Sequence, residues 1–258
     1  MAYTNIDDPS AYFTTTLWTG AGGSPRAITN DANSGNFQPD FVWTKGRNEA
    51  YEHNLYDSSR GTGTTKGLCS NDTSAEGTVS ASYGYLSSFD SNGFTGTAGT
   101  SGQNAYFDTN AKTYVAWQWK CNGGTTSTNT DGDINSTVQV NSDAGFSIVQ
   151  YVPTNTTARS IGHGLGVQPQ VVIVRNRPRV ENWRVFHRSA GTTGSLKLDD
   201  NTAYNSSTTL FTGDSTSTVF KVGTDFSVNG NYPYIAYCFA EKQGYSKFGK
   251  YVGNGNAN

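Results

Sequence analysis

The chain has 258 residues, enough for two domains of ordinary size. Its formal net charge is −2 and charged residues make up 15 % of it, so no extended basic field exists to attract nucleic acid. No stretch approaches about twenty apolar residues, and the opening residues have neither the basic nor the apolar part of a secretory signal. We therefore expect a soluble protein made in the cytoplasm, with no nucleic-acid partner and no insertion into a membrane.

The spacing of the apolar residues predicts the fold class. Short apolar runs alternate with turns rich in Gly, Asn, Asp and Ser, and no segment keeps apolar residues three and four apart for three helical turns. Hydrophobic residues make up only 34 % of the chain but aromatic residues 13 %, so burial must depend on Trp, Tyr and Phe. The sequence predicts an all-β protein of antiparallel sheets packed face to face, with a lectin-like jelly roll as the expected form.

In chain order, a leader of residues 1–12 precedes the first strand signal. Three signals of the first half then return in the same order in the second: "FTTTLWTG" (13–20) as "FSIVQYVP" (146–153), "FQPDFVWTKGR" (37–47) as "VQPQVVIVRNR" (167–177), and "TYVAWQWK" (113–120) as "YIAYCFA" (234–240). The order indicates a tandem duplication. We expect two β-sandwich units, 13–120 and 146–258, joined by a Gly/Thr/Asn-rich linker of residues 121–145.

The last pair of signals has the alternation of a strand. In an extended chain successive side chains point to opposite faces, so Val115, Trp117 and Trp119 should share one face. A third copy of the opening signal, "YVGNG", lies near the end of the chain, at residues 251–255. It indicates either an array whose third unit only begins, or a last strand that pairs with the opening strand of the second unit. We expect the second arrangement.

Motifs for catalysis are absent from the sequence. There is no GxSxG turn, and His53, His163 and His187 have no Ser or Cys in the context of a triad. His163 lies between glycines in "IGHGLG", where we expect a turn residue that caps backbone groups. The neighbouring carboxylates Asp199 and Asp200 would point in opposite directions in an extended chain, which does not suit shared acid–base work. We expect no catalytic residue.

Metal and cofactor sites are not expected either. The three cysteines, Cys69, Cys121 and Cys238, have no metal-binding spacing, and we expect packed or half-exposed thiols. Asp131 and Asp133 in "NTDGDIN" resemble the start of a calcium loop, but the glutamate that would complete the loop is missing. A turn in the linker is the preferred interpretation.

The aromatic residues divide into two groups. Trp117 and Trp119 are expected in the core, because the repeat preserves apolar character at their positions. Several tyrosines lie instead in polar, Gly/Ser-rich segments without apolar alternation, where an exposed ring can stack on a glycan. The candidate ligand-binding residues are Tyr83, Tyr85, Tyr106 and Tyr204.

The repeated motifs also carry a resemblance to a known family. The strings "FQPDFVWTKGR", "HNLYDSSRG", "SFDSNGFT" and "KTYVAWQWK", followed by "IGHGLGVQPQVVIVRNR" and "NWRVFH", resemble repeat-containing proteins of tailed bacteriophages of marine bacteria and cyanobacteria. The resemblance runs from Ile6 to Gly255. It implies a tail-fibre or concanavalin-like lectin-fold virion protein, and it carries no catalytic residue with it.

We therefore expect a non-enzymatic virion structural protein, of tail-fibre or spike type. The expected partners are other virion proteins, further copies of the chain in a homo-oligomer such as a trimer, and a glycan of the host surface. Three alternatives stay open at this point: a capsid decoration protein, a polysaccharide-degrading enzyme and a free lectin-like protein. The enzyme would need two carboxylates about 5 to 9.5 Å apart in a groove, and the repeat offers no such pair in both units.

Overall fold

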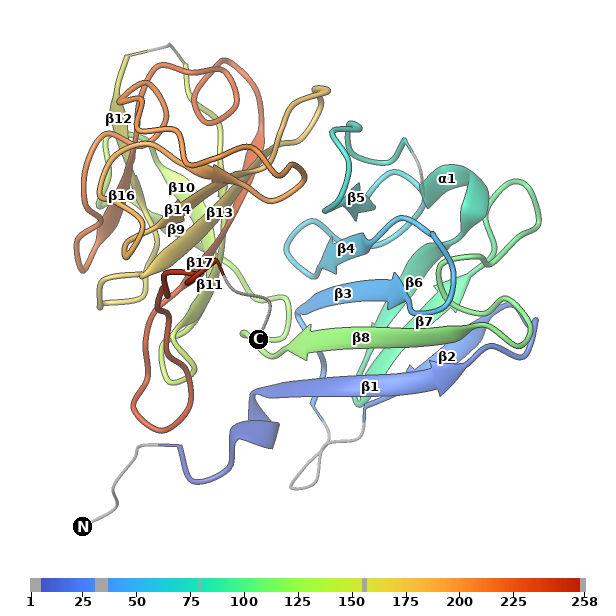
Figure 1. The fold of residues 1–258 in the computed structure, drawn as a ribbon. Helices are drawn as coiled ribbons and strands as arrows, with labels where there is room; N and C mark the ends of the chain where they lie inside the picture. Colours follow the sequence, from blue (N-terminus) through green and yellow to red (C-terminus); the bar gives the residue numbers. More distant parts are fainter. Residues whose placement is uncertain (1–5, 31–36, 79, 155–156, 256–258) are drawn as a thin grey trace.

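The computed structural model describes residues 6–30, 37–78, 80–154 and 157–255 (Figure 1). Strands predominate within them, and the described helical elements are the 3₁₀ turn η1 (Pro9–Ala11) and one turn of α-helix, α1 (Ser80–Tyr83). The prediction of an all-β protein is confirmed. In this part of the chain no helix is both long and apolar enough to cross a membrane.

Each half of the chain builds one large and one small antiparallel sheet. In the first half the large sheet runs β1 (Phe13–Thr19), β8 (Thr113–Trp119), β3 (Phe41–Gly46), β4 (Asn54–Asp57), β5 (Leu68–Cys69), and the small sheet runs β2 (Arg26–Thr29), β7 (Gly93–Thr97), β6 (Tyr85–Asp90). In the second half the large sheet runs β15 (Leu196–Lys197), β14 (Arg184–His187), β13 (Val171–Asn176), β17 (Tyr234–Phe239), β11 (Phe146–Tyr151), β10 (Ser136–Asn141), β9 (Ser127–Asn129), and the small sheet pairs β12 (Arg159–Gly162) with β16 (Val219–Val222).

The two large sheets share one strand order. The order β1-β8-β3-β4-β5 of the first half corresponds to β11-β17-β13-β14-β15 of the second. The strands that correspond are those that the sequence repeat matches, since β1, β3 and β8 align with β11, β13 and β17. This agreement between topology and sequence supports the tandem duplication. The second sheet differs by two further strands, β10 and β9, which lie beyond β11.

Each half has its own core between its large and its small sheet. In the first half Val42 and Ala116 of the large sheet pack with Ile28 and Phe94 of the small sheet. In the second half the corresponding core is larger, and Val172, Val174, Ala236 and Cys238 of the large sheet contribute to it together with Ile161, Phe220 and Val222 of the small sheet. Alternation explains this arrangement, because every second side chain of a strand reaches the same face.

A third core joins the two halves. It is formed by the outer faces of the two large sheets, and its buried members include Phe41 and Leu55 from the first half with Ile148, Ile235 and Tyr237 from the second. The Phe41 and Tyr237 rings stack with centroids 4.2 Å apart. Trp119 at the end of the repeated stripe on β8, and Tyr237 and Phe239 on β17, therefore pack against the other half of the chain rather than into the core of their own sandwich.

The segment predicted as a linker is partly folded. Residues 121–145 include β9 and β10, and β10 pairs with β11 along its whole length. The start of the segment is fixed by the buried carboxylate of Asp40, which accepts backbone N–H groups of Cys121 at 2.7 Å, Gly123 at 3.0 Å and Gly124 at 2.9 Å. The chain therefore passes from one half to the other along a defined path.

The expectation of a closing strand at the end of the chain was wrong. Residues 251–255 form no strand, and Tyr251 and Val252 are 94 % and 91 % exposed. The physical reason is that β10 already occupies the edge of β11 to which such a strand would bind. Of the predicted leader, residues 1–5 lie outside the described residues, while Ile6 is buried and the Tyr12 ring lies 6.2 Å from that of Tyr245.

Candidate functional site

A largely buried group of charged residues crosses the junction between the halves. Arg60, in the turn after β4, donates from Nε to Asp57 Oδ2 at 2.5 Å and from Nη1 to Glu76 Oε1 at 2.6 Å. Glu76 Oε2 accepts a second bond at 2.8 Å from Arg177 Nε of the other half, and the Tyr237 hydroxyl donates to Asp57 Oδ2 at 2.7 Å. Two arginines and two carboxylates thus neutralise one another, with the Asp57 and Arg60 side chains fully buried and those of Glu76 and Arg177 half-buried at the margin.

Burial and charge fix the protonation of this group. Burial by itself lowers the pKa of Arg60, but the charge of Asp57, followed by Tyr237 and Glu76, outweighs it and the pKa is raised. The pKa of Tyr237 is raised well above its ordinary value, first by burial, with Asp57 adding to the effect and Arg60 opposing it. Arg60 therefore stays charged and Tyr237 stays a hydrogen-bond donor, so the group acts as a fixed connection.

The second half also reaches backbone groups of the first. Trp183 is fully buried, and its Nε1 donates to the carbonyl of Cys69 at 2.7 Å. Arg175 Nη2 donates at 2.6 Å to the carbonyls of both Thr73 and Ser74, and the Arg175 guanidinium lies 5.6 Å from the centre of the Trp183 ring. Because the carbonyls at the end of β5 and in the middle of the loop that follows it are engaged, this loop is held by the second half.

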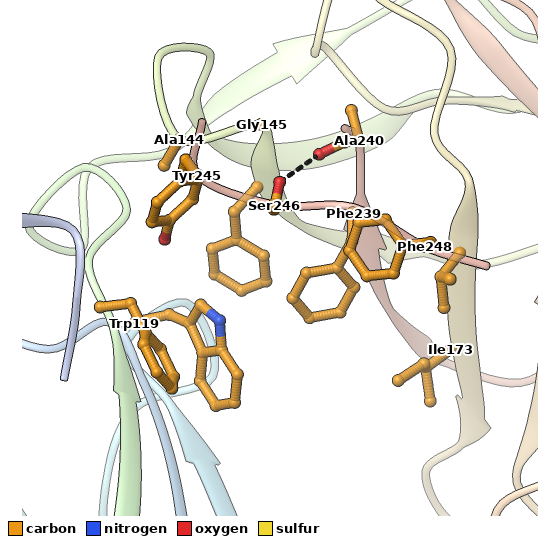
Figure 2. A pocket seen from close by; sticks show the side chains of 12 residues that line it. Trp119, Ala144, Gly145, Ile173, Phe239, Ala240, Tyr245, Ser246 and Phe248 are labelled. Carbon is orange, nitrogen blue, oxygen red and sulfur yellow. Dashed lines mark hydrogen bonds between the residues drawn. The ribbon is translucent and has the colours of Figure 1, made fainter. Parts of the chain in front are cut away.

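An aromatic pocket opens beside the junction (Figure 2). Its volume is about 360 Å³, and it lies where the ends of the two large sheets meet the C-terminal segment after β17. Its wall holds six aromatic rings: Phe13, Trp119, Phe146, Phe239, Tyr245 and Phe248. The Trp119 and Phe239 centroids are 6.1 Å apart, so the two copies of the repeated aromatic strand meet here.

The chemistry of this pocket is apolar. Of the described residues that line it, Tyr245 alone titrates, and burial, with a smaller effect of Tyr12, raises the pKa of that phenol to about 12. The Ser246 hydroxyl donates to the carbonyl of Ala240 at 3.1 Å (Figure 2). Such a lining can take an apolar side chain or an apolar ligand, and it offers no group for proton transfer near neutral pH.

Next to the junction, and packed against its core through Trp43, the outer face of the first large sheet presents a second aromatic surface. The rings of Trp43 and Trp117 are half-buried and meet edge to face with centroids 6.1 Å apart. Leu17 on β1, which pairs with Val115 on β8, is 56 % exposed. Trp117 was expected in the core. It shares the face of Trp119, as alternation predicts, but lies beyond the part of that face that the other half buries.

The four candidate tyrosines do not form one site. Tyr83 is 45 % exposed and its ring lies 6.3 Å from that of Tyr106, edge to face, but Tyr106 itself is buried. Tyr85 is half-buried and packs against the core of the first half. Tyr204 is half-buried in the other half of the chain, and its hydroxyl lies close to Gly191. Tyr83, supported by Tyr106, is the one of the four that presents a ring at the surface.

The residues weighed as metal ligands or catalysts have structural partners. Asp131 accepts from Asn129 Nδ2 at 2.9 Å, and Asp133 accepts from the amide and the hydroxyl of Ser160, each at 2.8 Å. His163 is fully buried, with Nδ1 accepting from the amide of Leu165 at 3.1 Å and Nε2 lying 3.2 Å from the carbonyl of Thr216. The expectation of a capping histidine is confirmed. No cluster of three or more metal-binding side chains occurs among the described residues.

All three cysteines are buried and unpaired as disulfides. Burial is the main cause of the raised thiol pKa, which is about 12 at both Cys69 and Cys238. Cys238 has no exposed surface, as expected for a packed thiol in a strand.

Among the comparisons with known proteins, the match is to a family model. A family model described as "Domain of unknown function (DUF7483)" matches residues 8–258. No curated protein and no solved structure matches the sequence.

Proposed function

The chain belongs to the DUF7483 family, and we propose that it is a non-enzymatic structural protein of a bacteriophage virion, of the tail-fibre or spike type. The observation that carries the proposal is the junction between the halves, where the buried pair Arg60 and Asp57 is extended by Glu76 and Arg177 beside stacked rings. A particle outside its host needs modules that keep their shape, and this junction supplies stiffness between the two sandwiches. The repeat motifs quoted from the sequence supply the link to virions.

The buried carboxylates of the described chain support a structural role. Asp40 binds the amides at the start of the segment between the halves, Asp57 binds Arg60 and Tyr237, and Asp108 accepts the amides of Ala21 at 2.9 Å and Gly23 at 2.6 Å. A glycosidase instead aims a pair of carboxylates into a groove that the sugar occupies. The carboxylates named here hold the fold together.

Adhesion to a host glycan belongs to the same proposal. Sugar rings stack on exposed aromatic faces, and Tyr83 presents such a face with Tyr106 packed behind it. The site would take a neutral saccharide, with polar groups of the neighbouring Ser- and Gly-rich segments as hydrogen-bond partners. The proposed partners are therefore other virion proteins, further copies of the chain and a saccharide of the host surface.

Purified particles of the phage that encodes the chain test the virion role. Mass spectrometry should find the chain as a stoichiometric component, and immunogold labelling should place it on the tail. Labelling spread over the capsid would favour the alternative of a decoration protein. Absence from the particles would overturn the virion proposal and favour a free lectin-like protein.

A glycan array tests adhesion separately. The wild-type chain should bind at least one class of saccharide, and Tyr83→Ala should abolish that binding, whereas Tyr204→Ala, a half-buried tyrosine of the other half, should retain it. Equal binding by Tyr83→Ala and the wild type would exclude the Tyr83 surface. No binding by the wild type would remove adhesion from the proposal while leaving the virion role to the particle experiment.

A further inference from the structure

The first strand of the chain is an edge strand with one open side. β1 ends the first large sheet and pairs only with β8 among the described strands. Lys120 donates to the carbonyl of Tyr12 and Gly20 to that of Lys112, so the even-numbered residues point their N–H and C=O groups toward β8. In an antiparallel ladder the alternate residues point theirs the other way. The backbone groups of Phe13, Thr15, Leu17 and Thr19 therefore face away from the sheet.

This edge has none of the features that normally prevent strands from pairing. Natural edge strands are kept short, bulged, charged or interrupted by proline. β1 has seven residues, "FTTTLWT", with no charge, no Pro and no Gly, and its register with β8 is unbroken. The other large-sheet edges of the described chain are short, with two residues in β5 and β15 and three in β9. In the small sheet of the same half, β2 has four residues and β6 has a register shift.

The second repeat shows what this edge binds when a strand is available. β11 is the counterpart of β1, and its equivalent edge is paired antiparallel with the six residues of β10. The fold therefore accepts an antiparallel strand at this position without a change in the rest of the sheet. In the first repeat the residues directly before β1 form η1 instead, so they do not supply such a strand.

We propose that β1 pairs antiparallel with β1 of a second copy of the chain. With the two-fold axis at Thr16, Phe13 lies opposite Thr19 and Thr15 opposite Leu17, and all four residues are those whose backbone groups point outward. The seven residues overlap completely in this register, and the interface is the same on both copies, as a closed dimer requires. The two large sheets become one continuous sheet.

The side chains on the outer face suit this register. Thr15 and Leu17 are exposed in the single chain, and they become a cross-strand pair in the dimer. The contact covers part of the Leu17 side chain, which is 56 % exposed in one copy. The proposal concerns the purified chain alone, so it does not depend on a virion role.

Light scattering on charge variants tests the interface. The wild type should have twice the 27.7 kDa mass of one chain. The double variant T15K/L17K should be monomeric, since each lysine would face another across the axis, and T15E/L17E should be monomeric for the same reason. An equal mixture of the two should recover the dimer mass, because each lysine then faces a glutamate. The control A203K/S206K places the same charge on an exposed loop of the second half and should stay dimeric.

Amide hydrogen exchange of the wild type gives an independent reading that needs no variant. The amides of Thr15 and Leu17 should exchange slowly at concentrations where the dimer forms and at least about 100-fold faster when it is diluted to monomer. A wild-type monomer whose Thr15 and Leu17 amides exchange fast would overturn the proposal. A dimer that persists in folded T15K/L17K, with fast exchange at these two amides, would place the interface elsewhere and overturn it as well.

Discussion

The Tyr237 hydroxyl of β17 donates to Asp57 Oδ2 of β4 at 2.7 Å, and the two residues lie in different copies of the repeat. Asp57 aligns with His187 and Tyr237 with Trp117, so the bond joins positions that are not equivalent in the two units. The junction is therefore not a simple symmetric contact. The two copies of the repeat carry different side chains at the positions that hold the halves together.

Substitutions of Tyr237 and Asp57 should separate the contribution of their hydrogen bond to the free energy of unfolding from the contribution of the Asp57 charge. Tyr237→Phe keeps the ring that stacks on Phe41 but loses the hydrogen bond to a charged partner, which costs about 1.5–3 kcal/mol of the free energy of unfolding. Asp57→Asn removes a charge from the buried ionic group and should cost about 3–5 kcal/mol. Urea unfolding measures both values. A loss below about 0.5 kcal/mol for Asp57→Asn would contradict the role given to the junction.

A surface ion pair provides the matched control. Arg188 Nε lies 3.0 Å from Asp214 Oδ2, but both side chains are about one-third or more exposed. Solvent screens such a pair, so Arg188→Gln should change the free energy of unfolding by at most about 1 kcal/mol. An effect as large as that of Asp57→Asn would show that burial is not what makes the junction strong.

Trp183 should be more sensitive to substitution than Trp43. Trp183→Phe leaves the buried carbonyl of Cys69 without its donor and opens space in the junction, which should cost about 2–3 kcal/mol. Trp43 Nε1 has no hydrogen-bond partner among the described residues, so Trp43→Phe should be close to neutral. Thermal unfolding of both variants checks this difference, and equal losses would argue against a special role of the Trp183 bond.

The three thiols should be inert until the protein unfolds. Cys69, Cys121 and Cys238 are buried and burial raises the pKa of each thiol, so little reactive thiolate is present at pH 8. A thiol reagent such as DTNB should therefore release no fast signal from the native chain and three equivalents in denaturant. Rapid labelling of one cysteine in the folded protein would contradict the packing described for it.

His163 should make stability depend on pH. Burial is the main cause of its lowered pKa, with the Thr216 carbonyl and Asp131 opposing it, so the unfolded chain takes up a proton at a higher pH than the folded chain does. The stability that the neutral His163 gives to the folded chain is fully present above the ordinary histidine pKa of about 6.5, and it is lost as the pH falls below that value. The variant His163→Asn should show a smaller loss of stability between pH 7 and pH 5 than the wild type. Identical pH profiles would contradict this assignment.

The sequence predicted the strands better than it predicted what they contact. The alternation in "TYVAWQWK" placed Trp119 on the right face, because period-two spacing reveals which side chains lie together. It could not reveal that another sheet covers this face, since an apolar stripe is the same whichever surface buries it. The strand β10 was missed because its two valines, Val138 and Val140, lie in a segment that is otherwise polar and rich in turn residues.

The residues of the candidate site were harder to predict from the sequence than the strands were. Tyr83, Tyr85, Tyr106 and Tyr204 were chosen from polar surroundings, yet Tyr106 is buried, because local composition does not report tertiary contacts. The Arg60 and Glu76 partners were not found either, since their signal is a contact between distant segments. A useful clue was present: "SSRG" directly follows β4 and "VRNR" runs from the end of β13 into the residue after it, so both motifs place arginines at the ends of strands.

The Phe41 and Tyr237 rings, stacked 4.2 Å apart, give the halves a contact whose two partners share one polypeptide. Separate subunits that meet through a similar surface dissociate when they are diluted, because their association depends on concentration. Covalent linkage replaces that dependence by a constant effective concentration. Fusion of the two units therefore preserves their contact at any dilution, including that of a single molecule.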